Sequence, residues 1–471
     1  MINVKRTKTS ILSVAFKGIL CNREGKHARN EEIAEIHKKN KKYVPVTDDE
    51  KLIDVPEHWV WTRLGYVTEN HGQTTPTETF SYIDVGTMDN VNQRLSKHEN
   101  LVEAKDAPSR AKKIVEKGDV LYSTVRPYLH NICIVDKDFT KKPIASTAFC
   151  VMAANEKVLN NRFLFYWLLT AEFDRFSNGN PSKGTLYPAI GEKDLLNGVI
   201  PLPPLKEQKE IVEIIEDAFN ALGQLDVAQS QYASDLEALK SKLIGAAICG
   251  KLTQQLPEDG DAEDLYNQVQ DEKARLIKEG KFKKEKPLPE IAERELPFEI
   301  PKNWKWVRWG NVINIVSARR VHQSDWRNEG IPFYRAREIA RLADKGTVNN
   351  DLFISEDLYN EFSKSGIPQC GDLMVTGVGT LGKAYVVKEN DKFYYKDASV
   401  LCFENYAGLD ALFLKKLMES DLMQTQINSN SGGTTVDTLT MVRMNQYLMP
   451  LPPLSEQRRI VERLEAIMEQ L

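Results

Sequence analysis

The sequence predicts a mixed α and β (α+β) fold in which a helical spacer separates two similar globular domains. The first observation is a repeat, because PLPPLKEQKEIVEIIE at 201–216 returns as PLPPLSEQRRIVERLE at 450–465. The second lies upstream, where VPEHWVWTRLGYV at 55–67 returns as IPKNWKWVRWGNV at 300–312. Solenoid repeats recur every roughly 20 to 50 residues, so copies this far apart must each be a domain with its own core.

A third repeat predicts that the duplicated architecture is circularly permuted. KTSILSVAFKGIL at 8–20 resembles KSKLIGAAICGKL at 240–252, with Gly18 matching Gly250. The central element at 201–250 is uninterrupted, whereas its second copy has one part at the C-terminus and the other at the N-terminus. If the termini meet in space, they rebuild a twin of the central element and create a pseudo-twofold axis.

The central element has the apolar periodicity of a coiled coil. Its apolar residues are spaced alternately four and three apart, interrupted by Gln229, and this 3.5-residue period is typical of a coiled-coil seam. A helix of this extent reaches about 55 Å. The alternative is an ordinary amphipathic core helix, but the duplicated context favours the coiled coil. The predicted seam, with its continuation near the C-terminus, contains Ile211, Ile215, Leu222, Leu225, Leu236, Leu239, Leu243, Ile460 and Leu464.

Composition indicates a soluble globular protein. The chain has 471 residues, of which 41% are hydrophobic and 28% charged, as in ordinary globular proteins. No apolar run approaches the roughly 20 residues that a membrane span needs, and no signal-peptide cleavage site follows the basic start. We therefore expect a cytoplasmic protein. The six cysteines lie far apart without a CxxC pair, which argues against a zinc module or a disulfide framework.

The chain order combines the repeats with strand-like and helical patterns. Strand-like runs at 119–124 and 132–135 share the first domain with a helical run at 161–176, and further helices are expected at 262–278 and 409–423. The predicted segments are 1–46, the N-terminal part of the split helix with a charged tail; 47–200, the first domain; 201–250, the spacer helix; 251–295, a polar helical linker; 296–449, the second domain; and 450–471, the C-terminal part of the split helix.

One glycine-rich run resembles a phosphate-binding loop. The run from Gly377 to Ala384, GVGTLGKA, matches GxGxxG, but Ala384 stands where a P-loop needs a hydroxyl for magnesium. The residues that follow alternate like a strand, whereas both glycine motifs require a helix there. We predict a tight turn between two strands, in which the glycines adopt positive φ.

The remaining motifs indicate a chain without catalytic function. The seven histidines lack HExxH spacing and no GxSxG sequence is present. There is also no Asn or Asp followed by Pro-Pro and an aromatic residue, the motif with which amino-methylating enzymes hold a flipped base. We expect neither a metal nor a cofactor on this chain.

The two domains resemble each other at their edges and differ in their interiors. Similar scaffolds with different interiors, held by a fixed spacer, suit the reading of two different short features at a set distance. Duplex DNA offers such features on a helical repeat of about 34 Å. The PLPPLxEQxxIV motif, the IPxxWxW segment, the spacer and the permuted repeat together resemble the specificity (S) subunit of type I restriction-modification systems.

This resemblance implies a function and a set of partners. In that family two target recognition domains each read one half of a bipartite DNA site, and two long antiparallel helices form a coiled coil. The coiled coil sets the gap and docks two methyltransferase (M) subunits, and restriction (R) subunits join the complex to cleave. S-adenosylmethionine, ATP and magnesium are implied for the partners and none for this chain. The C-terminal copy is shorter than the family pattern, so the N-terminal segment is expected to complete the second helix.

Candidate DNA-binding residues follow from side-chain chemistry, because the interiors vary within the family. Arginine suits guanine edges, Asn and Gln suit adenine, and Lys, Ser and Thr suit phosphates. The net charge of -4 requires that basic groups gather on one face or that partners supply part of the affinity. For each candidate the alternative is an ordinary solvated or ion-paired surface group. The candidates are Lys112, Lys113, Arg126, Tyr128, Lys183, Tyr187, Arg319, Arg320, Arg335, Arg337, Lys383, Thr434 and Thr435.

Two other classes of function stay open at this point. A self-sufficient enzyme would turn over substrate with no added subunit. A coiled-coil scaffold for protein assembly would show no salt-dependent DNA binding.

Overall fold

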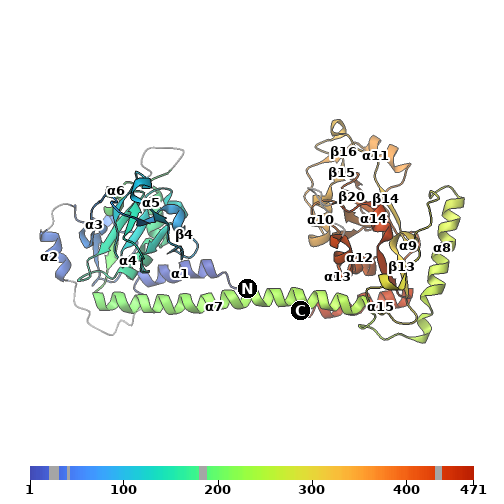
Figure 1. Ribbon diagram of the computed structural model, residues 1–471, viewed down its shortest axis with the longest axis horizontal. Coiled ribbons are helices and arrows are strands. Elements are labelled where there is room, and N and C mark those ends of the chain that lie inside the picture. The colour runs from blue at the N-terminus through green and yellow to red at the C-terminus, as the bar shows by residue number, and fades with distance from the viewer. Residues whose placement is uncertain (21–30, 40–42, 180–187, 430–437) are drawn as a thin grey trace. The chain divides into compact units, whose positions relative to one another are not determined.

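The computed structural model describes residues 1–20, 31–39, 43–179, 188–429 and 438–471 (Figure 1). These residues form two compact units, Met1–Ser230 (unit 1) and Gln231–Leu471 (unit 2). Each unit contains one of the two globular domains that the repeats predict. None of the helices in the described ranges is long and apolar enough to cross a membrane.

Unit 1 is built on a four-stranded antiparallel sheet with the order β2-β11-β8-β9. A second four-stranded sheet, β6-β3-β10-β7, is mixed, because β10 pairs parallel with β3. The pairs β1-β12 and β4-β5 complete the strands. Their bounds are β1 Val60–Arg63, β2 Thr68–Glu69, β3 Phe80–Ile83, β4 Met88–Asp89, β5 Arg94–Leu95, β6 Leu101–Val102, β7 Ala111–Ile114, β8 Val120–Ser123, β9 Ile132–Ile134, β10 Pro143–Ser146, β11 Phe149–Ala154 and β12 Val199–Leu202.

Unit 2 repeats the first sheet and the pair beside it. Its main sheet has the order β14-β20-β17-β18, and β13 pairs with β21 as β1 pairs with β12. A three-stranded sheet, β16-β15-β19, takes the place of the second sheet of unit 1. The bounds are β13 Lys305–Arg308, β14 Asn314–Ser317, β15 Ile331–Tyr334, β16 Phe353–Ile354, β17 Leu373–Thr376, β18 Ala384–Val386, β19 Tyr394–Tyr395, β20 Val400–Glu404 and β21 Leu448–Leu451. The mixed fold and the duplication are therefore confirmed.

The predicted helices are present, but two of them are broken. The runs at 161–176 and 409–423 each form two helices, divided at Thr170 and Ser420. Each hydroxyl donates to the carbonyl three residues earlier and accepts from the amide three residues later, so it ends one helix and caps the next. Outside the spacer the helices are α2 Glu31–Lys39, α3 Leu64–Val67, α4 Asn161–Leu168, α5 Ala171–Gly179, α6 Glu192–Leu196, α8 Ala262–Lys278, α9 Trp309–Val312, α10 Ala336–Lys345, α11 Glu356–Ser363, α12 Ala411–Glu419, α13 Asp421–Ser429 and α14 Met441–Gln446.

The predicted spacer is one continuous helix, α7 (Leu205–Ile248), visible as the long green helix in Figure 1. In unit 1, α1 (Val4–Phe16) packs against its first part and Lys8 lies over the Phe219 ring. The Gln229 side chain accepts from the Ile2 amide at 2.6 Å and donates to the Ile2 carbonyl at 3.2 Å. The one polar residue in the seam therefore holds the start of the helix that covers it.

The seam of α7 is buried only near its two ends. Ile211 and Ile215 lie in the core of unit 1 together with Leu12 and Phe16 of α1. In unit 2, α15 (Leu454–Met468) packs Ile460 and Leu464 against Ile244, Ala247 and Ile248. Between these ends Leu222, Leu225, Leu236 and Leu243 are half-buried, whereas Tyr232 and Leu239 are 60% and 42% exposed. The covering helices α1 and α15 are shorter than α7 and leave its middle open.

The repeated motifs form the same buried joint in both units. In unit 1 the Trp59 indole donates to the Glu207 carboxylate at 3.0 Å, and in unit 2 the Trp304 indole donates to Glu456 at 2.7 Å. Both carboxylates are at most 2% exposed. The tryptophan comes from the IPxxWxW segment, just before the first strand of each globular domain, and the glutamate comes from PLPPLxEQ. The bond therefore ties the start of each domain to the helix that follows the domain.

The glutamine of the PLPPLxEQ motif fixes a second contact of each joint. Gln208 accepts from the Asn160 amide at 2.8 Å and donates to the carbonyls of Val158 and Pro203. Gln457 accepts from the Asp410 amide at 3.0 Å and donates to the Pro452 carbonyl. Buried polar groups need such partners. The glutamine of the motif therefore has a structural role in both units.

Candidate nucleic-acid interface

The first group of loops lies at one end of the main sheet of unit 1. The connection from β8 to β9 contains a short 3₁₀ turn, Pro127–Leu129, with Tyr128 49% exposed. Arg126, just before this turn, donates its amide to the Pro188 carbonyl at 2.8 Å, and the Ile190 amide donates to Thr124 at 2.9 Å. The β8-β9 connection therefore lies beside the chain that follows residues 180–187.

Unit 2 has the equivalent connection at the same place. The glycine-rich run joins β17 to β18, with Gly379 at φ 72° and Gly382 at φ 76°. The turn interpretation is confirmed, because a strand and not a helix follows. The Leu439 amide donates to the Gly377 carbonyl at 2.9 Å, as Ile190 does to Thr124 in unit 1. The same end of the sheet thus carries a different loop in each unit.

The candidates in the described part of unit 1 lie in different surroundings. Arg126 and Tyr128 are exposed in the β8-β9 connection, and Lys112 is exposed on β7. Lys113 is 7% exposed and its ammonium binds the Glu192 carboxylate at 2.7 Å. This lysine serves an internal ion pair, and we leave it out of the proposed interface. The candidates Lys183 and Tyr187 fall outside the described residues.

Two candidates in unit 2 lie on exposed loops. The Arg319 guanidinium stands over the Phe362 ring at 4.4 Å and is 3.3 Å from the Glu361 carboxylate. Arg320 is 76% exposed, with its Nε 3.9 Å from Asp397. Surface pairs of this kind contribute about 0 to 1 kcal/mol, so both arginines can exchange these partners for phosphates or base edges.

Two other candidates are held by a buried acid. Arg335 and Arg337 bind the Glu338 carboxylate at 3.0 and 2.7 Å, and both reach Asp351. Burial disfavours the charged form of Glu338, but hydrogen bonds from the two arginines outweigh it and hold the pKa of this carboxyl below its ordinary value. The structure shows both arginines ion-paired at the start of α10. Their role in DNA binding stays a prediction from the sequence, and we leave them out of the proposed interface.

The last unit 2 candidates divide between the described and undescribed residues. Lys383, at the end of the glycine-rich turn, is 41% exposed and its ammonium lies 2.6 Å from the Asp344 carboxylate. Thr434 and Thr435 fall outside the described residues. Among the described residues of unit 2, the candidates that we keep in the proposed interface are Arg319, Arg320 and Lys383.

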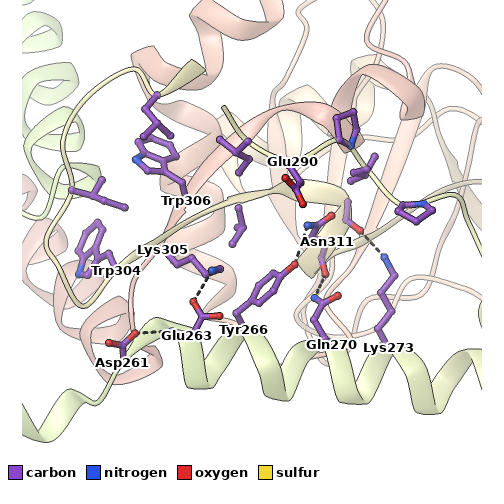
Figure 2. Close-up of a pocket in the computed structure, with 18 of the residues that line it drawn as sticks. Asp261, Glu263, Tyr266, Gln270, Lys273, Glu290, Trp304, Lys305, Trp306 and Asn311 are labelled. Carbon is purple, nitrogen blue, oxygen red and sulfur yellow. Dashed lines mark hydrogen bonds and ion pairs between the residues drawn. The ribbon is translucent and has the colours of Figure 1, made fainter. Parts of the chain in front are cut away.

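Unit 2 also has a cleft of about 1030 Å³ beside α8 (Figure 2). Its side chains hold α8 in place, because Gln270 donates to the Asn311 carbonyl at 2.8 Å and Lys273 to the Gly310 carbonyl at 2.6 Å. Burial lowers the pKa of the Lys273 ammonium. Lys305 pairs with Glu263 at 2.6 Å. These polar groups point to one another or to the backbone and do not converge on a ligand.

The described residues contain no cluster of His, Cys, Asp and Glu that could hold a metal ion. Sequence reasoning also missed a loop of unit 1, the β4-β5 hairpin, whose Asn90 side chain donates to the Leu129 carbonyl at 3.2 Å. Its strands have two residues each, too few for an apolar pattern. The only signal was a cluster of Asn and Gln, which is typical of turns.

The chain belongs to the family described as type I restriction modification DNA specificity domain, which matches residues 56–226 and 301–471. Each match begins at the tryptophan segment; the first ends within α7 and the second covers all of α15. The chain is 24% identical to the type I restriction enzyme EcoAI specificity subunit of Escherichia coli, over 92% of this chain and 81% of the relative. It is 22% identical to the EcoEI specificity subunit of the same organism, over 91% and 80%.

Two solved structures share the fold. A chain from a study of complex assembly and conformational transition of the type I R-M system superposes with a TM-score of 0.61, at 24% identity over 89% of this chain and 92% of that one. The HsdS subunit from Thermoanaerobacter tengcongensis gives a TM-score of 0.54, at 24% identity over 89% and 91%.

Proposed function

We propose that this chain is the DNA sequence-recognition subunit of a type I restriction-modification complex, in which each unit reads one half of a bipartite site. The observation that carries this proposal is the contrast between the repeated joints and the different loops. The Trp-Glu bond and the sheet order repeat in both units, whereas the β8-β9 and β17-β18 connections differ in sequence and shape. The shared sheet and joint, which we call the frame, therefore place two different surfaces at the same position in the two units.

The open middle of α7 supports its proposed role as spacer and docking surface. Tyr232 and Leu239 are 60% and 42% exposed on the seam face of this helix, and exposed apolar side chains of this size favour a protein partner. We assign this surface, with the half-buried seam leucines beside it, to two methyltransferase (M) subunits. Restriction (R) subunits would join when present. S-adenosylmethionine, ATP and magnesium would be bound by these partners, and the complex would act in the cytoplasm.

The charges of this chain also favour a role for partner subunits in DNA binding. Lys113, Arg335 and Arg337 are committed to internal carboxylates, and the whole chain has a net charge of -4. Phosphate contacts dominate the affinity of proteins for DNA. We therefore expect weak binding by this chain alone and strong binding by the complex.

The proposal is tested by the methylation pattern of host DNA. The chain is co-expressed with the proteins encoded beside it, methylated adenines are mapped by sequencing, and mapping is repeated after deletion of the chain. We expect methylation at one bipartite motif to disappear. An unchanged pattern would contradict DNA recognition and favour the coiled-coil scaffold.

A further inference from the structure

The tip of the β4-β5 hairpin in unit 1 has the side chains of a base-reading loop. Asn90, Val91, Asn92 and Arg94 are exposed, and Val91 is 80% exposed. An isolated valine at this exposure contributes nothing to the core. Amides beside an exposed methyl-bearing side chain match the major-groove edge of an A·T pair, which offers N7, N6 and the thymine methyl group.

The hairpin tip is ordered by its own hydrogen bonds. The Asp89 carboxylate accepts from the amides of Val91 and Asn92 at 3.1 Å and from the Asn92 side chain at 2.7 Å. Gln93 donates to the Asn90 carbonyl at 2.5 Å. A side-chain amide has two N–H donors and an oxygen with two lone pairs, so one internal bond leaves capacity for a base edge. The loop is therefore formed before DNA arrives, which reduces the entropy lost on binding.

The hairpin tip and the 3₁₀ turn form one surface, residues 89–94 and 126–130, which we call the unit 1 reading edge. Asn90 joins them through its bond to the Leu129 carbonyl. Behind the turn, the His130 ring binds the Asp174 carboxylate of α5 at 2.6 Å, and the Asn178 side chain donates to the same carboxylate at 2.8 Å. The turn is thus fixed to a helix of the domain.

The unit 1 reading edge contains several non-glycine residues with a strained, positive φ. Four described residues other than glycine have positive φ, and three of them, Gln93, Arg126 and His130, lie on the unit 1 reading edge. The fourth, Ala398 of unit 2, donates its amide to Ser317 near Arg320. Left-handed geometry is strained for a residue that carries a side chain, and strained residues cluster at functional sites.

We propose that the unit 1 reading edge recognises an A·T pair in the half-site of unit 1. Asn92 hydrogen-bonds the adenine edge and Val91 contacts the thymine methyl group. This inference rests on the proposed DNA-recognition function and adds the residues and the base pair. It assigns recognition to a loop that lies outside the sequence-derived candidates.

The test uses the full chain with its partner subunits in a host whose methylated motif has been mapped. The measured quantity is the ratio of methylation at sites with one altered base in one half-site to methylation at cognate sites. Asn92→Ala should raise this ratio by about fivefold or more. Val91→Ala should raise the same ratio by about fourfold, as expected from the loss of methyl contacts. The gap and the other half-site should be unchanged. The matched control is Val44→Ala, at a valine of unit 1 that is 69% exposed and should leave the motif intact.

Three outcomes decide against the proposal. If the wild-type complex methylates no bipartite motif, the proposed function itself fails. If the wild-type motif is found but both variants retain it at every position, or relax both half-sites equally, the function stands and this inference is overturned. If Asn92→Ala lowers the unfolding midpoint, Val91→Ala decides, because truncation of an exposed side chain removes no packing; an unaltered motif in that variant overturns the proposal.

Discussion

Units 1 and 2 are alike where they join the helices and different where we expect them to meet DNA. Both have a tryptophan bonded to a buried glutamate, and both have a main sheet of the same order. Beside this sheet, unit 1 carries the β4-β5 hairpin and unit 2 carries α10 with its buried Glu338. The repeated motifs therefore preserve the frame, while the loops at the sheet end give each unit a different surface.

The largest expected effect concerns a glycine that each unit uses in the same way. Gly18 and Gly250 have φ 66° and 69°, and an added Cβ would lie 2.4 and 2.3 Å from the rings of Pro56 and Pro301. Replacement of either glycine by Ala should lower the free energy of unfolding by about 3 kcal/mol, through left-handed strain and overpacking. Urea denaturation of the full chain measures this loss.

The matched control for these variants is Gly223→Ala. Gly223 lies within α7 and an added Cβ would meet nothing within 4 Å, so alanine should stabilise the helix by about 1 kcal/mol. If only one of Gly18→Ala and Gly250→Ala lowers the free energy of unfolding, the two joints are not equivalent.

Replacement of the buried glutamines should cost as much stability as replacement of the glycines, or less. Gln208→Ala removes three hydrogen bonds and Gln457→Ala two, at about 1 kcal/mol each. We expect losses of about 3 and 2 kcal/mol in the free energy of unfolding. The exposed Gln231→Ala should change it by less than about 0.5 kcal/mol. A loss at Gln457 greater than at Gln208 would contradict this account of the joint.

The equivalent turns of the two units should both be more stable with glycine than with alanine, although only unit 2 has a glycine there. In unit 1, Arg126 has φ 51°, so Arg126→Gly should be about 1 kcal/mol more stable than Arg126→Ala. In unit 2, Gly379 has φ 72° and open space around it, so Gly379→Ala should cost about 1 kcal/mol. Thermal unfolding compares the variants. Equal stability of the two Arg126 variants would remove the argument from strain.

A smaller difference between the units is sensitive to pH. Glu404 of β20 stands opposite Asn314, whereas the matching Ala153 of β11 stands opposite the exposed Glu69. Burial and the nearby Asp372 raise the pKa of Glu404 above 4.5, against a hydrogen bond from Asn314. The folded state therefore keeps a proton that the unfolded state releases, and stability falls as pH rises from 4.5 through the folded pKa.

Glu404→Gln should remove this part of the pH dependence. Its advantage in unfolding midpoint over the wild type should grow as pH rises from about 4.5 to 7. Glu69→Gln is the control, and its difference from the wild type should stay the same. A Glu404→Gln advantage that shrinks with rising pH would reverse the sign and contradict the assignment.

Regular features of the fold could be predicted from the sequence. The helix expected at 262–278 is α8 without a residue of error, and the glycine-rich turn lies where the motif placed it. Periodicity and turn chemistry are local, so they can be read without tertiary structure. The helix breaks at Thr170 and Ser420 were missed because hydroxyl capping does not alter the apolar period.

The candidate site was harder to predict because it depends on contacts between distant residues. Arg335 and Arg337 looked available in sequence, yet Asp351 and the fully buried Glu338 bind both. Only the fold shows that Asn90 lies beside Leu129. Burial of the seam likewise depends on how far α1 and α15 extend along α7, which its periodicity does not reveal.

The most direct test of the account is to lengthen α7 and read the methylated motif. A seven-residue insertion after Ser230 keeps the heptad and lies beyond the Ile2 contact at Gln229. It also lies before Ser241, which bonds Asp421 of α13, and before Leu243, which packs against the core of unit 2. It adds about 10 Å of helix, which corresponds to about three base pairs. Two different reading units held by a spacer predict a longer gap with both half-sites unchanged. Altered half-sites with an unchanged gap would contradict the account.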